Sequence, residues 1–175
     1  MNEAPLFLIG ARGSGKSTVA RLLARELGWN WLDADEEIEK RDGRSIRAIF
    51  ATEGEAGFRD KESTLLTQLC RLPRHVIATG GGVILREQNR ALLRSSGRIV
   101  WLSADVETLW QRVQADDATA QRRPPLTVGG RAEMEEIIQL RETLYRQCAD
   151  SVVETAGRAP NDIAAEILQW MNGNR

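Results

Sequence analysis

A glycine-rich segment near the N-terminus has the residue types and the spacing that bind phosphate. Residues 10–17, GARGSGKS, fit the pattern G-x-x-x-x-G-K-[ST] at every fixed position. In this pattern Gly13 and Gly15 let the backbone wrap tightly, so that successive N–H groups point at phosphate oxygens. Lys16 brings a positive charge to the β- and γ-phosphates, and the hydroxyl of Ser17 is placed to bind Mg2+. The segment therefore predicts a site for a nucleoside triphosphate with magnesium.

The same glycines fit two competing roles less well. The dinucleotide pattern G-x-G-x-x-G, started at Gly13, requires a glycine at position 18, where the chain has Thr18. A glycine-rich turn that only caps a helix is the second alternative. The combination of a preceding apolar run, the full spacing and a following helical pattern favours the nucleotide loop.

Two carboxylates follow the second apolar run, in the segment WLDAD. Asp33 and Asp35 lie two residues apart, so at strand spacing they share one face, beyond the carboxyl end of a strand, where open α/β sheets bind ligands. One can meet the water shell of Mg2+ and the other an acceptor hydroxyl, which phosphoryl transfer requires. The alternative is that Asp35 is the N-cap of the helix that begins with EEIEK.

Asp105 is a rival metal carboxylate, because it follows the cleaner apolar run IVWLSA. It can equally be the N-cap of a helix that starts at Val106. It ranks below Asp33, since no second carboxylate accompanies it and its strand lies much later in the chain.

Two further segments have the composition of a binding site. Gly80, Gly81 and Gly82 follow the third apolar run directly, and such glycines allow close approach of the backbone to a ligand, although they also suit a loose connector. Arg59 and Glu62 lie three residues apart, on one face of a predicted helix. From spacing alone, a solvated ion pair accounts for Arg59 and Glu62 better than a site does.

The elements that must position these residues alternate along the chain. Strands are expected at Leu6–Ile9, Trp29–Leu32, His75–Ala78, Ile99–Leu102 and Ser151–Val153. Helices are expected at Ser17–Leu27, Ile46–Glu53, Phe58–Arg71, Glu87–Ser95, Val106–Ala115, Glu133–Cys148 and Asn161–Met171. The alternation predicts an α/β fold: a three-layer α/β/α sandwich around a five-stranded parallel sheet.

Two stretches interrupt this alternation. Additional helical material between the second and third strands spans about Glu36 to Arg71. The segment Asp116–Gly130, DDATAQRRPPLTVGG, is polar and then rich in proline and glycine, and it separates two predicted helices. A loop of that length inside a domain is usually functional or disordered, so it is a candidate lid over the site.

Composition and charge limit the classes of function. A chain of 175 residues predicts a single domain, 1–175, and the net charge of −1 disfavours binding to nucleic acid. No apolar run is long enough to span a bilayer, so a cytoplasmic protein without membrane contact is expected. Cys70 and Cys148 lack metal-ligand spacing and are expected to be free thiols. No long apolar stripe requires a partner, so a monomer is expected.

These segments together resemble the shikimate kinase family, whose members make shikimate 3-phosphate from ATP and shikimate. GARGSGKST, DAD, GFRDKE, ATGGGV, RPPLTVGG, RETLY and GRAP occur in the family's order along nearly the whole chain. The resemblance implies a fold like that of the nucleoside monophosphate kinases. It also implies one kinase domain with a shikimate-binding subregion at 33–61 and a lid at about 113–130.

The resemblance also implies roles for individual residues. Those expected to bind ATP are Gly13, Ser14, Gly15, Lys16, Ser17, Thr18, Arg112, Arg123 and Arg158, with Arg112 and Arg158 flanking the adenine. Those expected to bind shikimate are Asp35, Arg59, Gly80, Gly81, Gly82 and Arg141, with the two arginines on its carboxylate and Glu62 holding Arg59. The metal ligands would be Ser17 and Asp33, with one Mg2+ ion, and the catalytic residues Lys16, Asp35 and Arg123. Either Arg122 or Arg123 would be the lid arginine, and the proline after Arg123 favours that residue.

Without the resemblance, the residues predict a magnesium-dependent enzyme that acts on a small anionic or hydroxylated acceptor. Another small-molecule kinase, for gluconate or a nucleoside, is the nearest alternative. A nucleoside kinase needs an aromatic surface for the base, and aromatic residues make up only 5% of the chain. A nucleotide-binding switch without turnover is the alternative from another class; it would bind ATP without releasing ADP in response to an acceptor.

Overall fold

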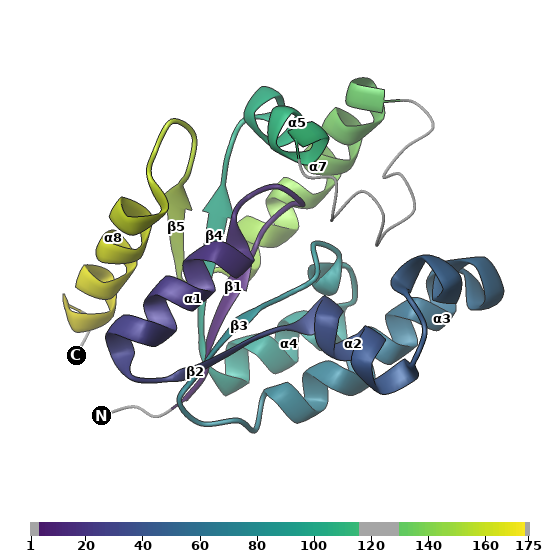
Figure 1. The fold of residues 1–175 in the computed structure, drawn as a ribbon, viewed down its shortest axis with the longest axis horizontal. Coiled ribbons are helices and arrows are strands. Elements are labelled where there is room, and N and C mark those ends of the chain that lie inside the picture. The colour runs from purple at the N-terminus through teal and green to yellow at the C-terminus, as the bar shows by residue number, and fades with distance from the viewer. Residues whose placement is uncertain (1–3, 116–129, 174–175) are drawn as a thin grey trace.

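The computed structural model describes residues 4–115 and 130–173, and its centre is a parallel sheet (Figure 1). The strands are β1 (Leu6–Ile9), β2 (Asn30–Asp33), β3 (His75–Ala78), β4 (Arg98–Ser103) and β5 (Ser151–Glu154). Their order is β2-β3-β1-β4-β5, and every pair is parallel. The first strand is therefore central, and the segments that leave β1, β2 and β3 emerge side by side at one edge of the sheet.

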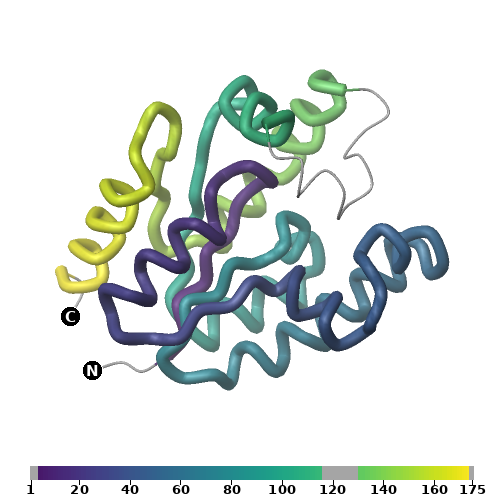
Figure 2. The backbone as a smooth tube through the Cα atoms, in the orientation of Figure 1, coloured from purple at the N-terminus to yellow at the C-terminus, as the bar shows by residue number. Residues whose placement is uncertain are grey.

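Helices cover both faces of this sheet (Figures 1 and 2). They are α1 (Lys16–Leu27), α2 (Ala34–Asp42), α3 (Ile46–Leu69), α4 (Glu87–Ser96), α5 (Val106–Ala115), α7 (Gly130–Cys148) and α8 (Pro160–Gly173), with a 3-10 turn, η1 (Val83–Leu85), before α4. Side chains alternate along β1: Leu6 and Leu8 pack with α1 and α8, whereas Phe7 and Ile9 pack with α2, α3, α4 and α7. The two cores confirm the three-layer sandwich and its five-stranded parallel sheet.

The connection from β2 to β3 contains the largest departure from the simple alternation. Two helices were expected at 46–53 and 58–71, and α3 indeed consists of two helical stretches, which meet at a kink without a loop between them. The helix breaks only at Gly54, whose φ of 70° and ψ of −176° are outside the helical region and suit glycine. Figure 2 shows that α2 and the first part of α3 consequently lie to one side of the sheet.

Candidate active site

The loop between β1 and α1 has a conformation that its neighbours require. Gly10, Gly13 and Gly15 all have positive φ, between 84° and 143°. A Cβ on Gly10 would lie 2.5 Å from the carbonyl oxygen of Leu102, and one on Gly13 would lie 2.9 Å from that of Leu109. The loop is therefore held tightly against the end of β4 and against α5, which only glycine at these positions allows.

The first turn of α1 is open to an anion. Its N-cap is Gly15, so no side chain accepts a hydrogen bond from the first amides, and the first turn has no acidic residue. The ammonium of Lys16 lies in the curve of the loop, where it donates to the carbonyl oxygens of Gly10 at 2.9 Å and Ala11 at 2.8 Å. Backbone N–H groups, the positive end of a helix and a lysine thus meet at one point, as phosphate binding requires.

The second part of the site joins α1 to the end of β2. The hydroxyl of Ser17 donates a hydrogen bond to Oδ2 of Asp33. The other oxygen, Oδ1, accepts the backbone N–H groups of Asp35 at 2.9 Å and Glu36 at 3.4 Å. Asp33 is therefore the N-cap of α2, and the alternative that Asp35 caps this helix is wrong.

The electrostatics of Asp33 fit a cation. Burial raises the pKa of this carboxyl above its usual range, and the neighbouring charge of Asp35 raises it further, although the hydrogen bond from Ser17 acts in the opposite direction. Hydroxyl and carboxylate oxygens are ligands that Mg2+ prefers. The paired oxygens of Ser17 and Asp33, beside the nucleotide loop, are thus a donor set that fits magnesium.

Asp105 instead serves as a helix cap. Its Oδ1 accepts the N–H of Thr108 at 2.8 Å and its Oδ2 accepts the hydroxyl of the same residue at 2.7 Å. These bonds hold the pKa of the exposed Asp105 carboxyl below its usual range. The position directly before Val106, the first residue of α5, is the N-cap position, so the capping alternative describes Asp105.

Arg59 and Glu62 form a buried pair on α3. The two residues are 8% and 3% exposed, and Nη1 of Arg59 donates to Oε2 of Glu62 at 2.7 Å. The solvated ion pair that spacing favours is therefore wrong. The guanidinium also packs against the glycine loop after β3, because a Cβ on Gly82 would lie 2.3 Å from Nη2 of Arg59. A side chain at position 82 would displace the arginine.

The glycine loop is itself buried between its neighbours. Gly80, Gly81 and Gly82 are all buried, which excludes a loose connector. A Cβ on Gly81 would lie 3.4 Å from the carbonyl oxygen of Gly10 and 3.6 Å from the backbone nitrogen of Arg12, so this loop is in contact with the nucleotide loop. The structure thus places Arg59, the glycines and the nucleotide loop at the same edge of the sheet.

Comparison with known proteins identifies the family. The family model for shikimate kinase matches residues 12–172. The shikimate kinases of Rhodopirellula baltica and Pseudomonas aeruginosa are each 46% identical to this chain over 165 residues, which is 94% of this chain and 88% and 94% of theirs. The chain belongs to the shikimate kinase family.

Solved structures agree with this assignment. A shikimate kinase from Acinetobacter baumannii, solved in complex with shikimate, superimposes with a TM-score of 0.92 at 38% identity, covering 98% of this chain and 94% of that one. A gluconokinase from Sinorhizobium meliloti has a TM-score of 0.59 at 16% identity, covering 98% and 93% of the two chains, which is a likeness of fold alone. The fold is therefore shared with other small-molecule kinases, while the sequence relationship is to shikimate kinases.

In this shikimate kinase family member, the two arginines expected near the adenine lie close to the turn after β5. Arg112 on α5 donates to the carbonyl oxygen of Gly13 at 3.3 Å, and to the hydroxyl and the carbonyl oxygen of Thr155 at 3.0 and 2.8 Å. Arg158 pairs with Glu166 at 2.7 Å. Sequence reasoning missed Thr155, which is fully buried and joins Arg112 to this turn. No local pattern distinguishes Thr155 from an ordinary strand residue.

Arg141, the last of the residues that the resemblance implies for shikimate binding, lies on α7. It is half-buried, and within residues 4–115 and 130–173 it forms no hydrogen bond or ion pair. Four residues later, Tyr145 is buried and its hydroxyl donates to the carbonyl oxygen of Gly81. The motif RETLY contained both residues, but the sequence suggested no role for the tyrosine.

Part of the predicted site lies outside the described residues. Arg122 and Arg123, and almost all of the predicted lid at 113–130, fall in the segment 116–129. Both cysteines in the described part are free, as expected. Among the helices of the described ranges, none combines the length and the apolar character needed to cross a membrane.

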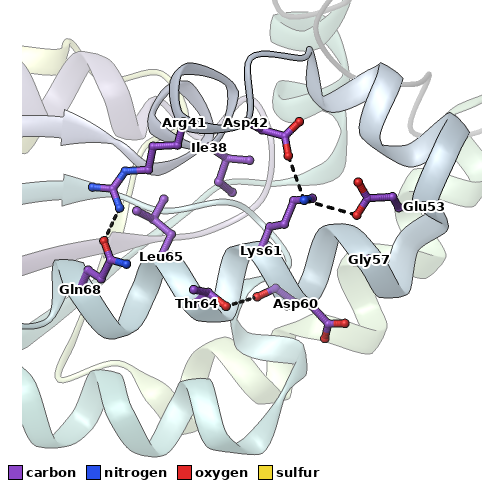
Figure 3. A pocket seen from close by; sticks show the side chains of 10 residues that line it. All are labelled: Ile38, Arg41, Asp42, Glu53, Gly57, Asp60, Lys61, Thr64, Leu65 and Gln68. Atoms are coloured by element: carbon purple, nitrogen blue, oxygen red, sulfur yellow. Dashed lines mark hydrogen bonds and ion pairs between the residues drawn. The ribbon is translucent and has the colours of Figure 1, made fainter.

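A separate cavity of about 350 Å³ lies between α2 and α3 (Figure 3). None of its lining residues is a predicted site residue. Instead, charges surround it: Lys61 binds Asp42 at 2.8 Å and Glu53 at 3.4 Å, and Arg44 binds Asp42 at 2.5 Å. These pairs connect the end of α2 to both sides of the break at Gly54, so they stabilise the bent arrangement of α2 and α3.

This cluster predicts an acid-dependent loss of stability. Hydrogen bonds from Arg44 and then Lys61 lower the pKa of Asp42 to about 2. A depressed carboxyl pKa stabilises the folded state above the unfolded value of about 4, and the contribution is lost as the pH falls from about 4 to about 2. In an Asp42→Asn variant, the unfolding temperature should therefore fall less steeply across this pH window. Asp60→Asn, at a mostly exposed residue of α3, is the control; equal slopes for Asp42→Asn and wild type would contradict the prediction.

Proposed function

We propose that this protein transfers the γ-phosphoryl group of ATP to the 3-hydroxyl of shikimate, giving shikimate 3-phosphate and ADP. Membership of the family supports the reaction, and the solved relative that holds shikimate supports the acceptor. The observation that carries the proposal in this chain is the buried Arg59–Glu62 pair against Gly82, beside the nucleotide loop. A guanidinium held in that way is prepared for a carboxylate, and shikimate is a carboxylate.

On the nucleotide side, the proposed contacts follow from the loop. The amides of Gly13 to Thr18 bind the phosphates, and Lys16 exchanges its bonds to loop carbonyls for bonds to phosphate oxygens. Ser17 and Asp33 would hold one Mg2+ ion, Asp33 through water. When bound, the ion neutralises charge on the phosphates.

On the acceptor side, Asp35 follows the proposed metal ligand Asp33 by two residues and lies in the first turn of α2. We assign to it a hydrogen bond from the acceptor hydroxyl, as general base or as the group that orients the oxygen for attack on the γ-phosphorus. Arg59 and Arg141 would hold the shikimate carboxylate, because the planar fork of a guanidinium matches two carboxylate oxygens. We call these two arginines the proposed clamp. The buried loop at Gly80–Gly82 would present its backbone to the ring.

Several parts of the proposal rest on the sequence alone. Arg123, with Arg122 beside it, would close over the phosphates and stabilise the charge that develops during transfer. Arg112 and Arg158 would flank the adenine. A cytoplasmic monomer that does not bind nucleic acid also stays a prediction.

Replacing Arg59 by lysine should weaken the acceptor site selectively. Lysine keeps a positive charge near Glu62 but loses the planar pair of donors, so we expect the KM for shikimate to rise about tenfold or more while the KM for ATP stays nearly unchanged. Arg86→Lys is the matched control, since Arg86 also pairs with a carboxylate of α3, that of Asp60, and is not a predicted site residue. Steady-state kinetics with each substrate varied in turn gives both constants, and an unchanged shikimate KM would remove Arg59 from the proposed clamp.

The reaction itself is tested by its product. The protein is incubated with Mg-ATP and shikimate, and the product is examined by mass spectrometry and phosphorus NMR. We expect one added phosphoryl group on shikimate, with phosphorus coupled to the proton at carbon 3. Phosphorylation at another hydroxyl, or hydrolysis of ATP without a phosphorylated product, would refute the proposal.

A further inference from the structure

Tyr145 joins two parts of the acceptor site that are distant in sequence. It is 1% exposed on α7, and its hydroxyl donates to the carbonyl oxygen of Gly81, 64 residues earlier in the chain. Buried tyrosine hydroxyls generally find such a partner. Here the partner is a backbone carbonyl of the glycine loop itself, and not of a distant part of the core.

This bond acts on the loop where the loop meets the proposed clamp. The peptide unit that contains the carbonyl of Gly81 also contains the nitrogen of Gly82, and the unit is planar. Fixing the carbonyl toward α7 therefore fixes the orientation of the whole unit. On the next residue, the space where a Cβ would lie is filled by the guanidinium of Arg59. The position of Arg59 thus depends on how the peptide unit held by Tyr145 is placed.

The tyrosine is itself held firmly. Its ring stacks on Trp101 of β4, with 5.6 Å between the ring centroids and an interplanar angle of 18°. Trp101 is 6% exposed and belongs to a strand in the interior of the sheet. The hydroxyl therefore has a fixed position relative to the sheet.

The same helix also carries Arg141, four residues before Tyr145. Residues at this spacing lie on the same face of a helix, one turn apart. One side of α7 thus bears both a proposed carboxylate ligand and the residue that fixes the loop packed against the other proposed ligand, Arg59. The Tyr145–Gly81 bond thus connects the helix that carries Arg141 to the loop against which Arg59 packs.

We infer that Tyr145 is a positioning residue for the acceptor site, which sets the placement of Arg59 relative to Arg141 by holding the carbonyl of Gly81. The inference rests on the proposed function for its effect on shikimate. It predicts a larger effect on the acceptor than on the nucleotide, because the tyrosine hydroxyl bonds to the carbonyl oxygen of Gly81, in the peptide unit next to which the guanidinium of Arg59 packs.

Tyr145→Phe isolates the hydroxyl, because phenylalanine keeps the ring and its packing on Trp101. We expect the KM for shikimate to rise about five- to tenfold, the effect of losing one buried hydrogen bond. The KM for ATP should change less than about twofold, which lies within the scatter of such contributions. Leu144→Ala is the matched control: Leu144 is the neighbouring residue of α7, partly buried against the same core. It should lower the unfolding temperature and leave the shikimate KM unchanged.

Two kinetic results would overturn the inference. One is a shikimate KM in Tyr145→Phe equal to that of wild type. The other is a rise in Leu144→Ala as large as that in Tyr145→Phe, which would mean that any loosening of α7 has the same effect.

A measurement without substrate tests the same contact independently of the proposed function. Amide hydrogen exchange is followed for residues 79–86, where the N–H of Val83 bonds to Gly80 at 3.2 Å and that of Leu85 bonds to Gly82 at 3.0 Å. Exchange of these amides should be faster in Tyr145→Phe than in wild type or Leu144→Ala. Unchanged exchange would show that the hydroxyl does not hold the loop, whereas a wild-type protein that fails to phosphorylate shikimate would refute the proposed function and leave the exchange result to decide the role of Tyr145.

Discussion

A Lys16→Met protein should fold normally and lose kcat by a factor of about a thousand, the effect typical of removing a charge that stabilises a developing anion. The ammonium of Lys16 lies inside the curve of the nucleotide loop, 2.9 and 2.8 Å from the carbonyl oxygens of Gly10 and Ala11. Methionine fills a similar volume without the charge. The fold should survive because α1 is anchored by other side chains, among them Val19 and Leu23, which are fully buried against the sheet.

Lys40→Met is the control for this variant. The chain has only three lysines, and Lys40 is exposed on α2, away from the loop. The measurements are kcat with saturating Mg-ATP and shikimate, and the unfolding temperature of each protein. We expect Lys40→Met to match wild type in both. Near-normal turnover in Lys16→Met would show that the phosphates bind elsewhere.

Asp33→Asn should become inactive and, at the same time, more stable at neutral pH. Asparagine can keep the cap of α2 and can still face the hydroxyl of Ser17, because its amide oxygen accepts and its nitrogen donates. It removes a partly buried negative charge beside Asp35. Loss of a carboxylate that orients the ion should reduce activity by at least about a hundredfold.

The pH dependence of this stability has a definite sign. The pKa of Asp33 is raised in the folded protein, by burial first and by Asp35 second. A raised carboxyl pKa means that ionisation opposes folding, so the cost appears as the pH rises above the unfolded value of about 4 and is complete above the folded value. The gain in unfolding temperature of Asp33→Asn over wild type should therefore be present at pH 7 and disappear toward about pH 4.

Asp105→Asn provides the opposite case, since its hydrogen bonds with Thr108 hold the pKa of that carboxyl low. At pH 7 this variant should be no more stable than wild type and should keep its turnover. If Asp33→Asn stayed active while Asp105→Asn lost activity, the metal carboxylate would have to be reassigned to the rival position.

The sequence predicts those features of the fold well that depend on residues close together in the chain. Short apolar runs placed all five strands to within about one residue, and the spacing of the glycines and Lys16 identified the nucleotide loop. The cap of α2 was assigned to Asp35 as the alternative, although Asp33 forms it, because both residues suit an N-cap and only the backbone geometry chooses between them. Local patterns thus predict which elements exist better than where they begin.

The candidate site depended on contacts that no local pattern contains. Spacing placed Arg59 and Glu62 on one helix face but indicated exposure, whereas Gly82, from a later strand end, buries the arginine. The bonds of Tyr145 to Gly81 and of Arg112 to Thr155 likewise join residues far apart in the chain. Arg59 and Arg141 could therefore be predicted as ligands of the shikimate carboxylate only from the resemblance of whole motifs to the family.

The fold does not choose the acceptor. A gluconokinase shares the architecture at a TM-score of 0.59, and gluconate also carries a carboxylate that an arginine clamp would suit. The choice between such acceptors therefore rests on the residues around Asp35 and Arg59, and it has to be tested with the acceptors themselves.

The most direct test is the release of ADP from Mg-ATP with a panel of acceptors: shikimate, quinate, gluconate, a nucleoside and none. Strong stimulation of ADP release by shikimate, with the other acceptors near the level without acceptor, is the predicted result. If gluconate or the nucleoside stimulated release more than shikimate, or if no acceptor did so although ATP bound, the acceptor site built from Asp35, Arg59 and Arg141 would be wrong.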